Sequence, residues 1–270
     1  MDMTPETPVP DAPRQTPASV QAMKQRGEKI AVLTAYDYPT ARLLDESGIE
    51  VLLVGDSLGM VVLGYPDTTH VTMDEMVHHV RPVARAARRA LVVADLPIAS
   101  YQIPDQAMIN ARRLVAAGAH AVKLEGGREQ VDQIEAIVQA GIPVMAHLGM
   151  LPQSVKKEGG YKIKGRTTIE AERLLEDAGC VQQAGAFAVV LELVQSEVAA
   201  RLSTSLAIPT IGIGSGPDCD GQVLVSHDLI GLFPWFTPKF VAPHGHVADQ
   251  IRASAAAFIA QTKRSDGKLA

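Results

Sequence analysis

The sequence predicts a single-domain α/β protein with the fold of a (β/α)8 TIM barrel, and three observations support this. Short apolar runs alternate with helical patterns from residue 30 onward, similar glycine-containing segments recur where a helix turns into a strand, and ionisable residues follow the strand ends. The length of 270 residues and the 47% of apolar side chains allow one large barrel or two small domains. The strand-end residues favour the barrel over an open doubly wound sheet, because all strand ends of a barrel meet on one face.

Eight runs are too continuously apolar for half-exposed antiparallel strands, and they suit parallel strands that are buried on both faces. The segments between them can form the crossover helices that a parallel sheet needs. The low aromatic content of 4% predicts a core of aliphatic side chains. The predicted strands are Ile30–Tyr36, Val51–Val54, Leu91–Ala94, Ala121–Leu124, Ile142–Ala146, Ala188–Leu191, Ile208–Ile213 and Val223–Val225.

Helix boundaries agree with this alternation. Thr72 with Glu75 and Thr167 with Glu170 fit capping boxes, and Pro104 can occupy a first-turn position. Four glycines stand where a helix ends in a left-handed residue before the chain enters a strand. These glycines are Gly48, Gly118, Gly141 and Gly185.

The two ends of the chain differ from the rest in composition. Residues 1–19 hold five prolines and almost nothing apolar, which predicts a disordered N-terminal tail. Residues 20–261 are the predicted catalytic barrel, and residues 262–270 are a polar C-terminal tail. The first residues lack the basic and apolar regions of a signal peptide, and no apolar run approaches the roughly 18 residues of a membrane span. We therefore expect a cytoplasmic protein.

Charge and cysteine content exclude several classes of partner. A net charge of -5 without a basic block makes nucleic acid and anionic membranes poor candidates. Cys180 and Cys219 are too few for a disulfide scaffold and show no metal-binding spacing, so a reducing compartment is the simpler interpretation.

Polar residues follow the predicted strands at their carboxyl ends. Three carboxylates, Asp56, Asp95 and Glu125, end consecutive strands, where they would repel one another unless a cation lies between them. An all-oxygen set suits a hard ion such as Mg²⁺. Each aspartate could instead cap the helix that follows it. The strand-end residues are Asp37, Asp56, Asp95, Lys123, Glu125, His147, Glu192, the turn 212–216, His227 and Asp228.

Lys123 lies two residues before Glu125 in one strand, so both side chains point into the barrel. A buried lysine is costly without an anion, and Lys123 could bind a carboxylate, balance the acids, form a Schiff base or simply pair with an acid. His147 could be an acid or base, a ligand or a hydrogen-bonded core residue. Glu192 ends an apolar run that disfavours its ionised form, which makes it a plausible proton acceptor.

Two glycine-rich segments complete the predicted site. The IGIGSGP turn at 211–217 could cradle a phosphate or could simply need glycines for a tight turn. Residues 149–166 form a long segment with five basic residues after the fifth strand. A segment of that length in a compact domain is typical of a closing lid, although its charges could equally face solvent.

Ordered motifs over roughly residues 20–260 resemble the ketopantoate hydroxymethyltransferase family, also called 3-methyl-2-oxobutanoate hydroxymethyltransferases. The motifs are VGDSLGM (54–60), ADLP (94–97), VKLEGG (122–127), HLG with PQSV (147–155), GGYKIKGR (159–166), VLEL (190–193), IGIGSGPDCDGQVLVSHD (211–228) and TPKF (237–240). The resemblance implies a (β/α)8 barrel that transfers a hydroxymethyl group from 5,10-methylenetetrahydrofolate to 3-methyl-2-oxobutanoate through a Mg²⁺-stabilised enolate. The product, 2-dehydropantoate, leads to pantothenate and coenzyme A. A homodecamer of two pentameric rings is also implied.

The resemblance assigns roles to residues that match its motifs. Asp56 and Asp95 correspond to direct Mg²⁺ ligands, and Glu125 is the third metal-site carboxylate, acting directly or through water. Ser57 and Lys123 correspond to the groups that hold the substrate carboxylate, His147 supports Lys123 or the substrate, and Glu192 is the proton acceptor. The implied substrate-binding set is Asp56, Ser57, Asp95, Lys123 and His147. The sequence departs from the family at Glu158, where an apolar residue is frequent, and at Leu193, Gln195 and Ser215.

Two alternatives predict different behaviour. A metal-dependent 2-oxo acid lyase of the phosphoenolpyruvate-binding barrel type would share the metal and the enolate and would need no folate. A non-catalytic barrel that serves as a binding module would be expected to have lost polar strand-end residues, which are present here.

Overall fold

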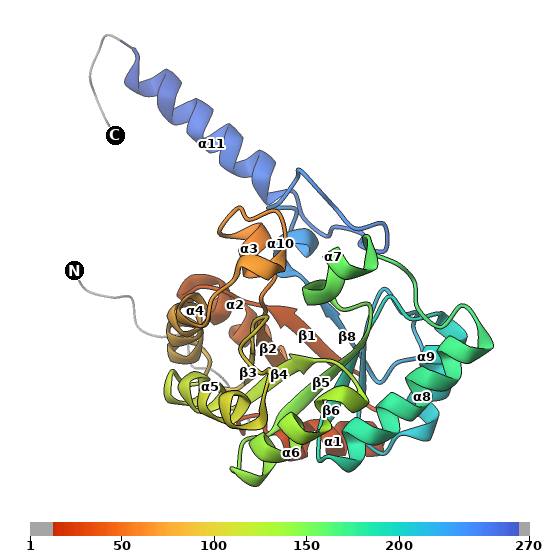
Figure 1. The fold of residues 1–270 in the computed structure, drawn as a ribbon. Coiled ribbons are helices and arrows are strands. Elements are labelled where there is room, and N and C mark those ends of the chain that lie inside the picture. The colour runs from red at the N-terminus through yellow and green to blue at the C-terminus, as the bar shows by residue number, and fades with distance from the viewer. Residues whose placement is uncertain (1–12, 265–270) are drawn as a thin grey trace. The chain divides into compact units, whose positions relative to one another are not determined.

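The computed structural model describes residues 13–264 and confirms the predicted (β/α)8 barrel. Within these residues eight parallel strands close in the order β1-β2-β3-β4-β5-β6-β7-β8, and helices surround them (Figure 1). The strands are β1 Ile30–Thr34, β2 Val51–Val54, β3 Leu91–Asp95, β4 Ala121–Glu125, β5 Val144–Gly149, β6 Ala188–Glu192, β7 Thr210–Ile213 and β8 Gly221–Leu224.

The helices lie between consecutive strands and at the two ends of the chain. The α-helices are α1 Pro17–Arg26, α2 Tyr38–Glu46, α3 Leu58–Val61, α4 Met73–Ala86, α5 Pro104–Ala116, α6 Val131–Gln139, α7 Val155–Glu158, α8 Thr168–Gln183, α9 Ser196–Ser205, α10 Ser226–Leu229 and α11 Val247–Thr262. The short 3-10 helices are η1 Thr68–His70, η2 Arg128–Gln130 and η3 Pro152–Ser154.

Local signals account for most of these boundaries. Thr72 and Glu75 form the predicted capping box at the start of α4. Thr167 accepts a hydrogen bond from the Glu170 backbone, but the Glu170 carboxylate accepts from the backbone of Arg166 instead of Thr167, so only half of that predicted box forms. Each of the four predicted junction glycines has a positive φ, between 79° and 113°, because the chain turns sharply there from helix to strand.

Apolar side chains form two layers separated by the barrel wall. The inner layer fills the barrel with strand residues such as Val51, Leu91 and Met145, together with Val20 and Met23 of α1. The outer layer packs the helices against the strands. In Figure 1, α1 lies at the end of the barrel opposite α3 and α7. The first helix therefore covers the amino end of the barrel and leaves the other end for polar residues.

The N-terminal boundary differs from the prediction. Helix α1 begins at Pro17 with Thr16 as its N-cap, so its first residues fall within the segment 1–19 that the sequence predicts to be a tail. The proline-rich composition hid this helix, because proline suits the first turn of a helix as well as a disordered segment. Residues 1–12 of the predicted tail, and 265–270 of the predicted C-terminal tail, lie outside the described residues.

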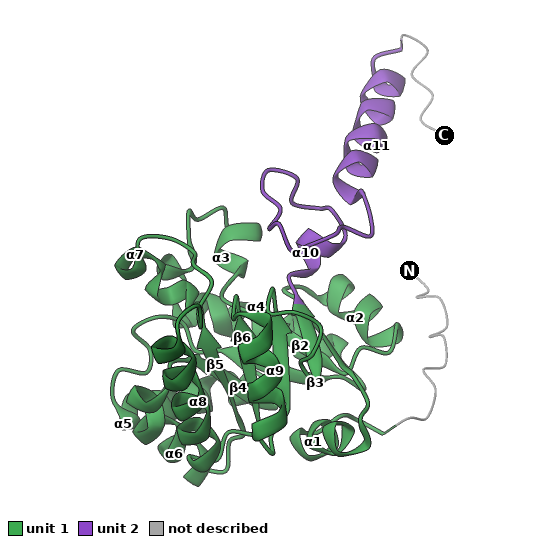
Figure 2. Ribbon diagram, turned by 90° about the vertical axis from the view of Figure 1, so that its right-hand side faces the viewer, with its two compact units in different colours: residues 1–223 green, residues 224–270 purple. Residues whose placement is uncertain are grey.

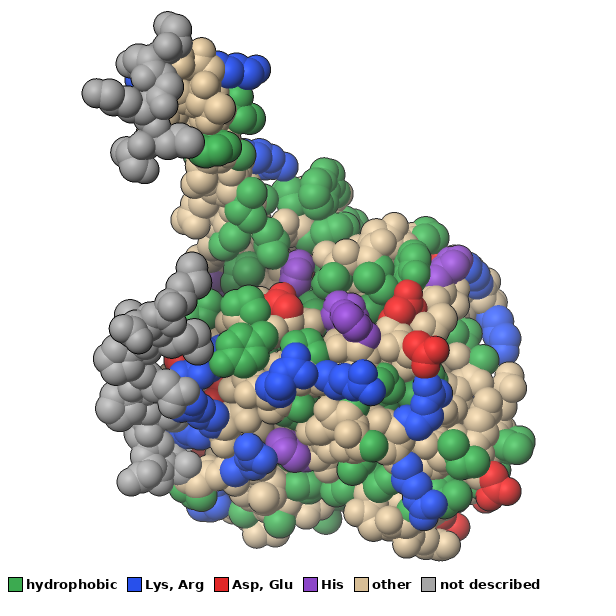
Figure 3. Space-filling view, turned by 90° about the vertical axis from the view of Figure 1, so that its left-hand side faces the viewer, with side chains coloured by type: hydrophobic (Ala, Val, Ile, Leu, Met, Phe, Trp, Pro, Cys, Tyr) green, Lys and Arg blue, Asp and Glu red, His purple; other side chains and the backbone are tan. Residues whose placement is uncertain are grey.

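The chain divides into two compact units, residues 1–223 and residues 224–270 (Figure 2). The first holds almost the whole barrel, and the second contains α10 and α11. On the face of the first unit that carries α4 and α5, basic side chains are mixed with hydrophobic, histidine and acidic ones (Figure 3). Among the described helices, none is both long enough and apolar enough to cross a membrane.

Candidate active site

The carboxyl ends of five neighbouring strands bring the predicted site residues together. Asp95, Glu125 and Glu192 are the last residues of β3, β4 and β6. Three further residues, Asp56 just after β2, Lys123 in β4 and His147 in β5, lie at the same level. Contacts below 4 Å join all six, as expected for strand ends that meet on one face.

Lys123 lies at the centre of this cluster and is almost fully buried. Its Nζ atom lies 3.0 Å from Asp95 Oδ1 and 3.3 Å from His147 Nδ1. Because an ammonium group can only donate, Nδ1 of His147 must accept, and the imidazole proton is then on Nε2. The predicted inward orientation of Lys123 and Glu125 is confirmed, since both contact residues of the site.

Asp56 and Asp95 come from neighbouring strands and contact each other directly. The backbone N–H of Asp56 donates to Asp95 Oδ2 at 3.0 Å. Gly55 precedes Asp56, and a Cβ atom there would lie 2.9 Å from Ser57 Oγ and in ordinary contact, at 3.6 Å, with Asp95 Oδ2. The strand-end backbone thus fixes the two aspartates side by side.

His147 lies between the remaining two acids. Its Nδ1 atom is 3.6 Å from Glu125 Oε1, and its Nε2 atom is 3.3 Å from Glu192 Oε2, although the second contact lacks hydrogen-bond geometry. The imidazole N–H therefore faces the Glu192 carboxylate at close range.

Burial and like charges shift the pKa values of the acids. Burial, followed by the Asp95 charge, raises the pKa of Asp56 to about 7. Burial and the Asp56 charge raise the pKa of Glu125 well above its usual value. Burial also raises the pKa of Glu192 to about 7, against the opposing effect of Lys123. The site therefore favours any ligand that supplies positive charge.

The surroundings shift the pKa values of His147 and Lys123 in opposite directions. Burial, followed by the Lys123 charge, lowers the pKa of His147 well below its usual value. Burial would also lower the pKa of Lys123, but Asp95, Glu125 and Asp56 outweigh it and raise that pKa. Lys123 is therefore a permanent cation, which makes a free amine for Schiff-base chemistry unfavourable, and His147 is neutral.

The donor set fits a hydrated hard cation. Asp56, Asp95 and Glu125 supply carboxylate oxygens, and Glu125 Oε1 is buried with no hydrogen bond. Between residues 13 and 264, however, no three side chains of the His, Cys, Asp and Glu types converge into a preassembled metal cage. Mg²⁺ usually keeps several waters and binds through one or two carboxylates plus substrate oxygens. These residues suit that mode of binding better than an all-protein cage.

Sequence reasoning assigned no role to Tyr36, Tyr101 or Gln153, which also reach the site. The Tyr36 hydroxyl lies 2.8 Å from Ser57 Oγ. Gln153 contacts both Asp56 and Glu125, and Tyr101 donates to its amide oxygen. Gln153 lies in the PQSV motif, so the motif pointed to the segment without revealing the contact.

The predicted lid segment, residues 149–166, begins against the end of β6. A Cβ atom at Gly149 would lie 2.2 Å from the backbone oxygen of Glu192, and the Gly149 φ is 95°, so only glycine fits. The next residue, Met150, donates its N–H to that same oxygen at 2.7 Å. The close approach fixes the backbone of the predicted proton acceptor.

The far end of this segment returns to the same strand. The Lys164 backbone pairs with Leu193 and Gln195, just after β6. Glu158, which departs from the family pattern, forms an ion pair with Lys164. The lid role itself stays a prediction.

The glycine-rich turn after β7 supports β6 from its other side. Ser215 Oγ accepts a hydrogen bond from the Val194 backbone at 2.9 Å and donates to the Leu191 oxygen at 2.7 Å. Gly214 and Gly216 have φ values of 62° and 86°, as the tight-turn alternative requires. The turn therefore has a structural task, whether or not it also binds an anion.

Some strand-end residues do not join the cluster. Asp37 caps α2 by accepting from the Thr40 backbone, which is the structural alternative considered for strand-end aspartates. His227 and Asp228 lie in α10, within the second unit.

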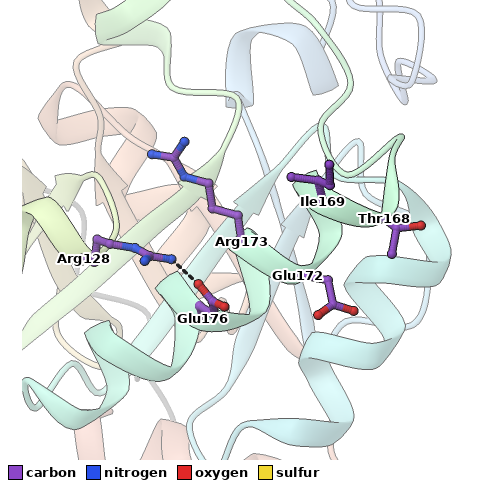
Figure 4. A pocket seen from close by; sticks show the side chains of 6 residues that line it. All are labelled: Arg128, Thr168, Ile169, Glu172, Arg173 and Glu176. Atoms are coloured by element: carbon purple, nitrogen blue, oxygen red, sulfur yellow. Dashed lines mark hydrogen bonds and ion pairs between the residues drawn. The ribbon is translucent and has the colours of Figure 1, made fainter.

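A separate surface hollow of about 720 Å³ lies along α8 and beside η2 (Figure 4). Arg128 reaches across to Glu176 at 2.6 Å, and Ile169 is 82% exposed. Exposed ion pairs of this kind are ordinary surface features. The hollow has none of the buried polar groups that distinguish the strand-end cluster.

Comparison with known proteins identifies relatives over nearly the whole chain. A family model described as ketopantoate hydroxymethyltransferase matches residues 14–266. The chain is 54% identical to 3-methyl-2-oxobutanoate hydroxymethyltransferase of Syntrophus aciditrophicus, over 92% of each chain. It is 56% identical to the protein of the same name from Moorella thermoacetica, over 87% of this chain and 88% of the other.

Solved structures of more distant proteins share the fold. Phosphonopyruvate hydrolase in complex with oxalate and Mg²⁺ aligns with a TM-score of 0.63 and 14% identity, over 94% of this chain and 88% of the other. A 2,3-dimethylmalate lyase aligns with a TM-score of 0.60 and 18% identity, over 94% and 90% of the two chains. At these identities the likeness concerns the barrel alone.

Proposed function

The chain belongs to the ketopantoate hydroxymethyltransferase family, and from this we propose that it transfers a hydroxymethyl group from 5,10-methylenetetrahydrofolate to 3-methyl-2-oxobutanoate with the help of Mg²⁺. The product is 2-dehydropantoate, a precursor of pantothenate. The observation that carries the proposal is the cluster of four acids around one buried lysine, placed where a barrel enzyme has its active site.

Asp56 and Asp95 would hold Mg²⁺ directly, and Glu125 would hold it directly or through water. A bound Mg²⁺ ion polarises the keto group of a 2-oxo acid and makes the C3 hydrogen more acidic. The raised pKa values of Asp56 and Glu125 support this assignment, because a cation relieves the repulsion that raises them. This fold can accommodate such an ion, since phosphonopyruvate hydrolase was crystallised with Mg²⁺ and oxalate.

Lys123 and Ser57 would bind the substrate carboxylate. Lys123 keeps its positive charge in this surrounding and is held in place by Asp95 and His147. The Ser57 hydroxyl is oriented by its contact with Tyr36 and can donate to an anion. His147, neutral and protonated on Nε2, would keep Lys123 in position on one side and face Glu192 on the other.

Glu192 would remove the C3 proton of the bound 2-oxo acid. A carboxylate with a pKa near 7 is partly ionised at neutral pH and is a stronger base than an exposed glutamate. The C3 carbanion would then form a C–C bond with the methylene carbon of the folate, while both C–N bonds of that carbon break and water supplies the hydroxyl oxygen of the product. Glu192 and the water would each return one proton to the folate nitrogens, which leaves tetrahydrofolate. Among the site acids Glu192 is also the least enclosed, with 13% of its side chain exposed, so a substrate can reach it.

The replacement Glu192→Gln tests the proposed base. It should abolish exchange of the C3 hydrogen of 3-methyl-2-oxobutanoate in deuterated water, followed by NMR, because an amide cannot accept the proton. Mg²⁺-dependent binding of the substrate should stay within a few-fold of wild type. Glu197→Gln, an exposed residue in the first turn of α9, is the matched control and should exchange normally.

Two outcomes would change the assignment. Exchange at the wild-type rate in Glu192→Gln would remove Glu192 from the role of base. Turnover of a 2-oxo acid without any one-carbon donor would favour the lyase alternative over hydroxymethyl transfer, because only the transferase needs a folate.

We also propose that the chain assembles into a homodecamer of two pentameric rings, as its family resemblance implies. Within the second unit, α11 exposes Ile251, Phe258 and Ile259 by 50% or more, which leaves an apolar helix surface available for a partner subunit. Light scattering should give about ten times the 28.7 kDa of one chain. A monomer mass would contradict the assembly without affecting the assigned reaction.

A further inference from the structure

Gln153 uses every polar atom of its side chain within the site. Its amide nitrogen donates to Asp56 Oδ2 at 2.8 Å and to the backbone oxygen of Leu96 at 3.1 Å. Its amide oxygen accepts from the Tyr101 hydroxyl at 2.5 Å. The side chain is buried, so water does not compete for these bonds.

The orientation of this amide is determined by its neighbours. A reversed amide would place its oxygen against two acceptors, the Asp56 carboxylate and the Leu96 carbonyl, and its nitrogen against the phenol. Only the observed orientation pairs each donor with an acceptor. The Asp56 carboxylate and the Leu96 carbonyl, which can only accept, therefore fix which end of the amide faces Asp56, and Tyr101 holds the opposite end in place.

The backbone of the same residue holds a second carboxylate. The Gln153 N–H donates to Glu125 Oε2 at 3.0 Å, while Glu125 Oε1 stays without a hydrogen bond. One residue thus contacts acids from β2 and β4 and occupies one oxygen of each. Gln153 thereby helps to hold both buried carboxylates in defined orientations.

We propose that Gln153, held in place by Tyr101, is a positioning residue that presents Asp56 and Glu125 to the divalent cation. The inference rests on the proposed function, because it assigns a task toward the Mg²⁺ ion of that reaction. Gln153 touches neither substrate nor reacting atoms in this role and acts through the two carboxylates. Groups that orient metal-binding carboxylates typically contribute 10- to 100-fold to metal affinity.

The position of Gln153 links the metal site to the segment 149–166. Gln153 lies in η3, and the following α7 carries Lys156, whose Nζ atom contacts Asp67 at 3.1 Å and Thr69 Oγ1 at 2.8 Å. These bonds fasten the segment to the loop after β2. If the segment moved away, Gln153 would leave both carboxylates, so placement of the segment and orientation of the acids are coupled.

The test compares Gln153→Met, Tyr101→Phe and the double variant in the full chain. Mg²⁺ is titrated calorimetrically in the presence of saturating 3-methyl-2-oxobutanoate and without folate. Gln153→Met should weaken Mg²⁺ binding about 10- to 100-fold, because methionine has a similar length and no donor. Tyr101→Phe should weaken it about 3- to 10-fold, since the Asp56 contact survives but the amide oxygen loses its partner.

Two readouts separate positioning from a merely structural role. Since Tyr101 acts through Gln153, the double variant should bind Mg²⁺ no more weakly than Gln153→Met alone. At saturating Mg²⁺, kcat should return to within about threefold of wild type, so that the loss is confined to metal affinity. Gln182→Met is the matched control, because Gln182 accepts from the Ala207 and Ile208 backbones ahead of β7, and it should bind Mg²⁺ normally.

The outcomes distinguish this inference from the proposed function. Absence of Mg²⁺ binding by the wild-type protein overturns both. Wild-type binding that changes less than twofold in Gln153→Met overturns the positioning role alone. Additive losses in the double variant overturn the claim that Tyr101 acts through Gln153. If Gln153→Met fails to fold, an unchanged Mg²⁺ affinity in Tyr101→Phe, which preserves the ring, overturns the role of the pair.

Discussion

At the amino end of the barrel Asp45 and Asp220 have hydrogen-bond partners for their charges, whereas at the carboxyl end acids outnumber the cations that face them. Asp45, at the end of α2, accepts hydrogen bonds from the backbones of Arg88, Arg89 and Ala90 just before β3. Asp220, just before β8, pairs with Lys24 of α1 at 2.8 Å and accepts from Thr210. These charges connect elements of the fold.

At the carboxyl end, Asp56, Asp95, Glu125 and Glu192 face one lysine and a neutral histidine. Lys123 and Gln153 relieve their mutual repulsion only in part, and burial makes it stronger. The comparison teaches that a charged group with all its hydrogen-bond partners present stabilises the fold. Acids crowded together without enough cations reduce stability and form a site that a cation can occupy. Mutations at the two ends should therefore change stability in opposite directions.

The largest expected effect is a loss of stability at the amino end. Asp45→Ala removes the acceptor of three backbone N–H groups, one of them buried and two part-buried, and should lower the free energy of unfolding by about 4 kcal/mol. Asp45→Asn, which retains one acceptor oxygen, should lose less. Urea denaturation followed by circular dichroism measures both, and a loss below about 1 kcal/mol for Asp45→Ala would contradict the structural role.

The second effect has the opposite sign. Asp56→Asn should stabilise the metal-free protein by about 2 kcal/mol at pH 8, because it removes a buried charge that burial and Asp95 disfavour. The same variant should lose activity by more than about 1,000-fold, since a proposed direct metal ligand is gone. Urea denaturation in EDTA measures the change in stability, and an assay for 2-dehydropantoate measures the change in activity. A variant less stable than wild type would show that the protein already balances the negative charge of the acids at this end.

The third prediction concerns pH. Because the pKa of Glu192 is about 7 in the folded protein and near 4.5 when unfolded, the unfolded state releases its proton first as pH rises. The stability of the metal-free protein should therefore fall between about pH 4.5 and 7 and then level off. In Glu192→Gln this pH-dependent decrease in the free energy of unfolding should be smaller by about 1.5 kcal/mol. Identical pH profiles for the two proteins, measured by urea denaturation in EDTA, would disprove the raised pKa.

The smallest effect returns to the amino end. Lys24→Met removes the ion pair with Asp220 and a hydrogen bond to the Ser203 oxygen, but Asp220 keeps its bonds to Thr210. The free energy of unfolding should fall by about 1 kcal/mol. Activity per folded molecule should stay at the wild-type value, because α1 lies at the opposite end of the barrel from the site. A change in kcat would refute the separation of the two ends.

The sequence predicted the barrel and the polar strand ends because both depend on local patterns. Apolar runs and junction glycines mark strands wherever they occur, and a closed parallel barrel then brings Asp56, Asp95 and Glu192 to one face without further information. Proposed roles for these residues came from resemblance and chemistry, and they remain to be tested by experiment.

The remaining features depend on contacts that no periodic pattern encodes. Gln153 reaches Asp56 only because an irregular segment folds back across the strand ends. Glu158, whose packing the sequence left open, finds its partner Lys164 within the same segment. Helix α1 was partly missed because its apolar residues are few and its prolines suggested a tail. Loop conformations of this kind follow from tertiary packing and not from local propensity.

Gly149 shows that a position can be indispensable without taking part in chemistry. Any side chain there would collide with the backbone oxygen of Glu192, and the left-handed φ adds a second obstacle. In a mutational scan this position would appear as intolerant as the acids themselves, although its effect is purely geometric. For protein engineers who wish to change the substrate range, the junction between β5 and β6 is therefore a fixed point, and diversity must be introduced elsewhere.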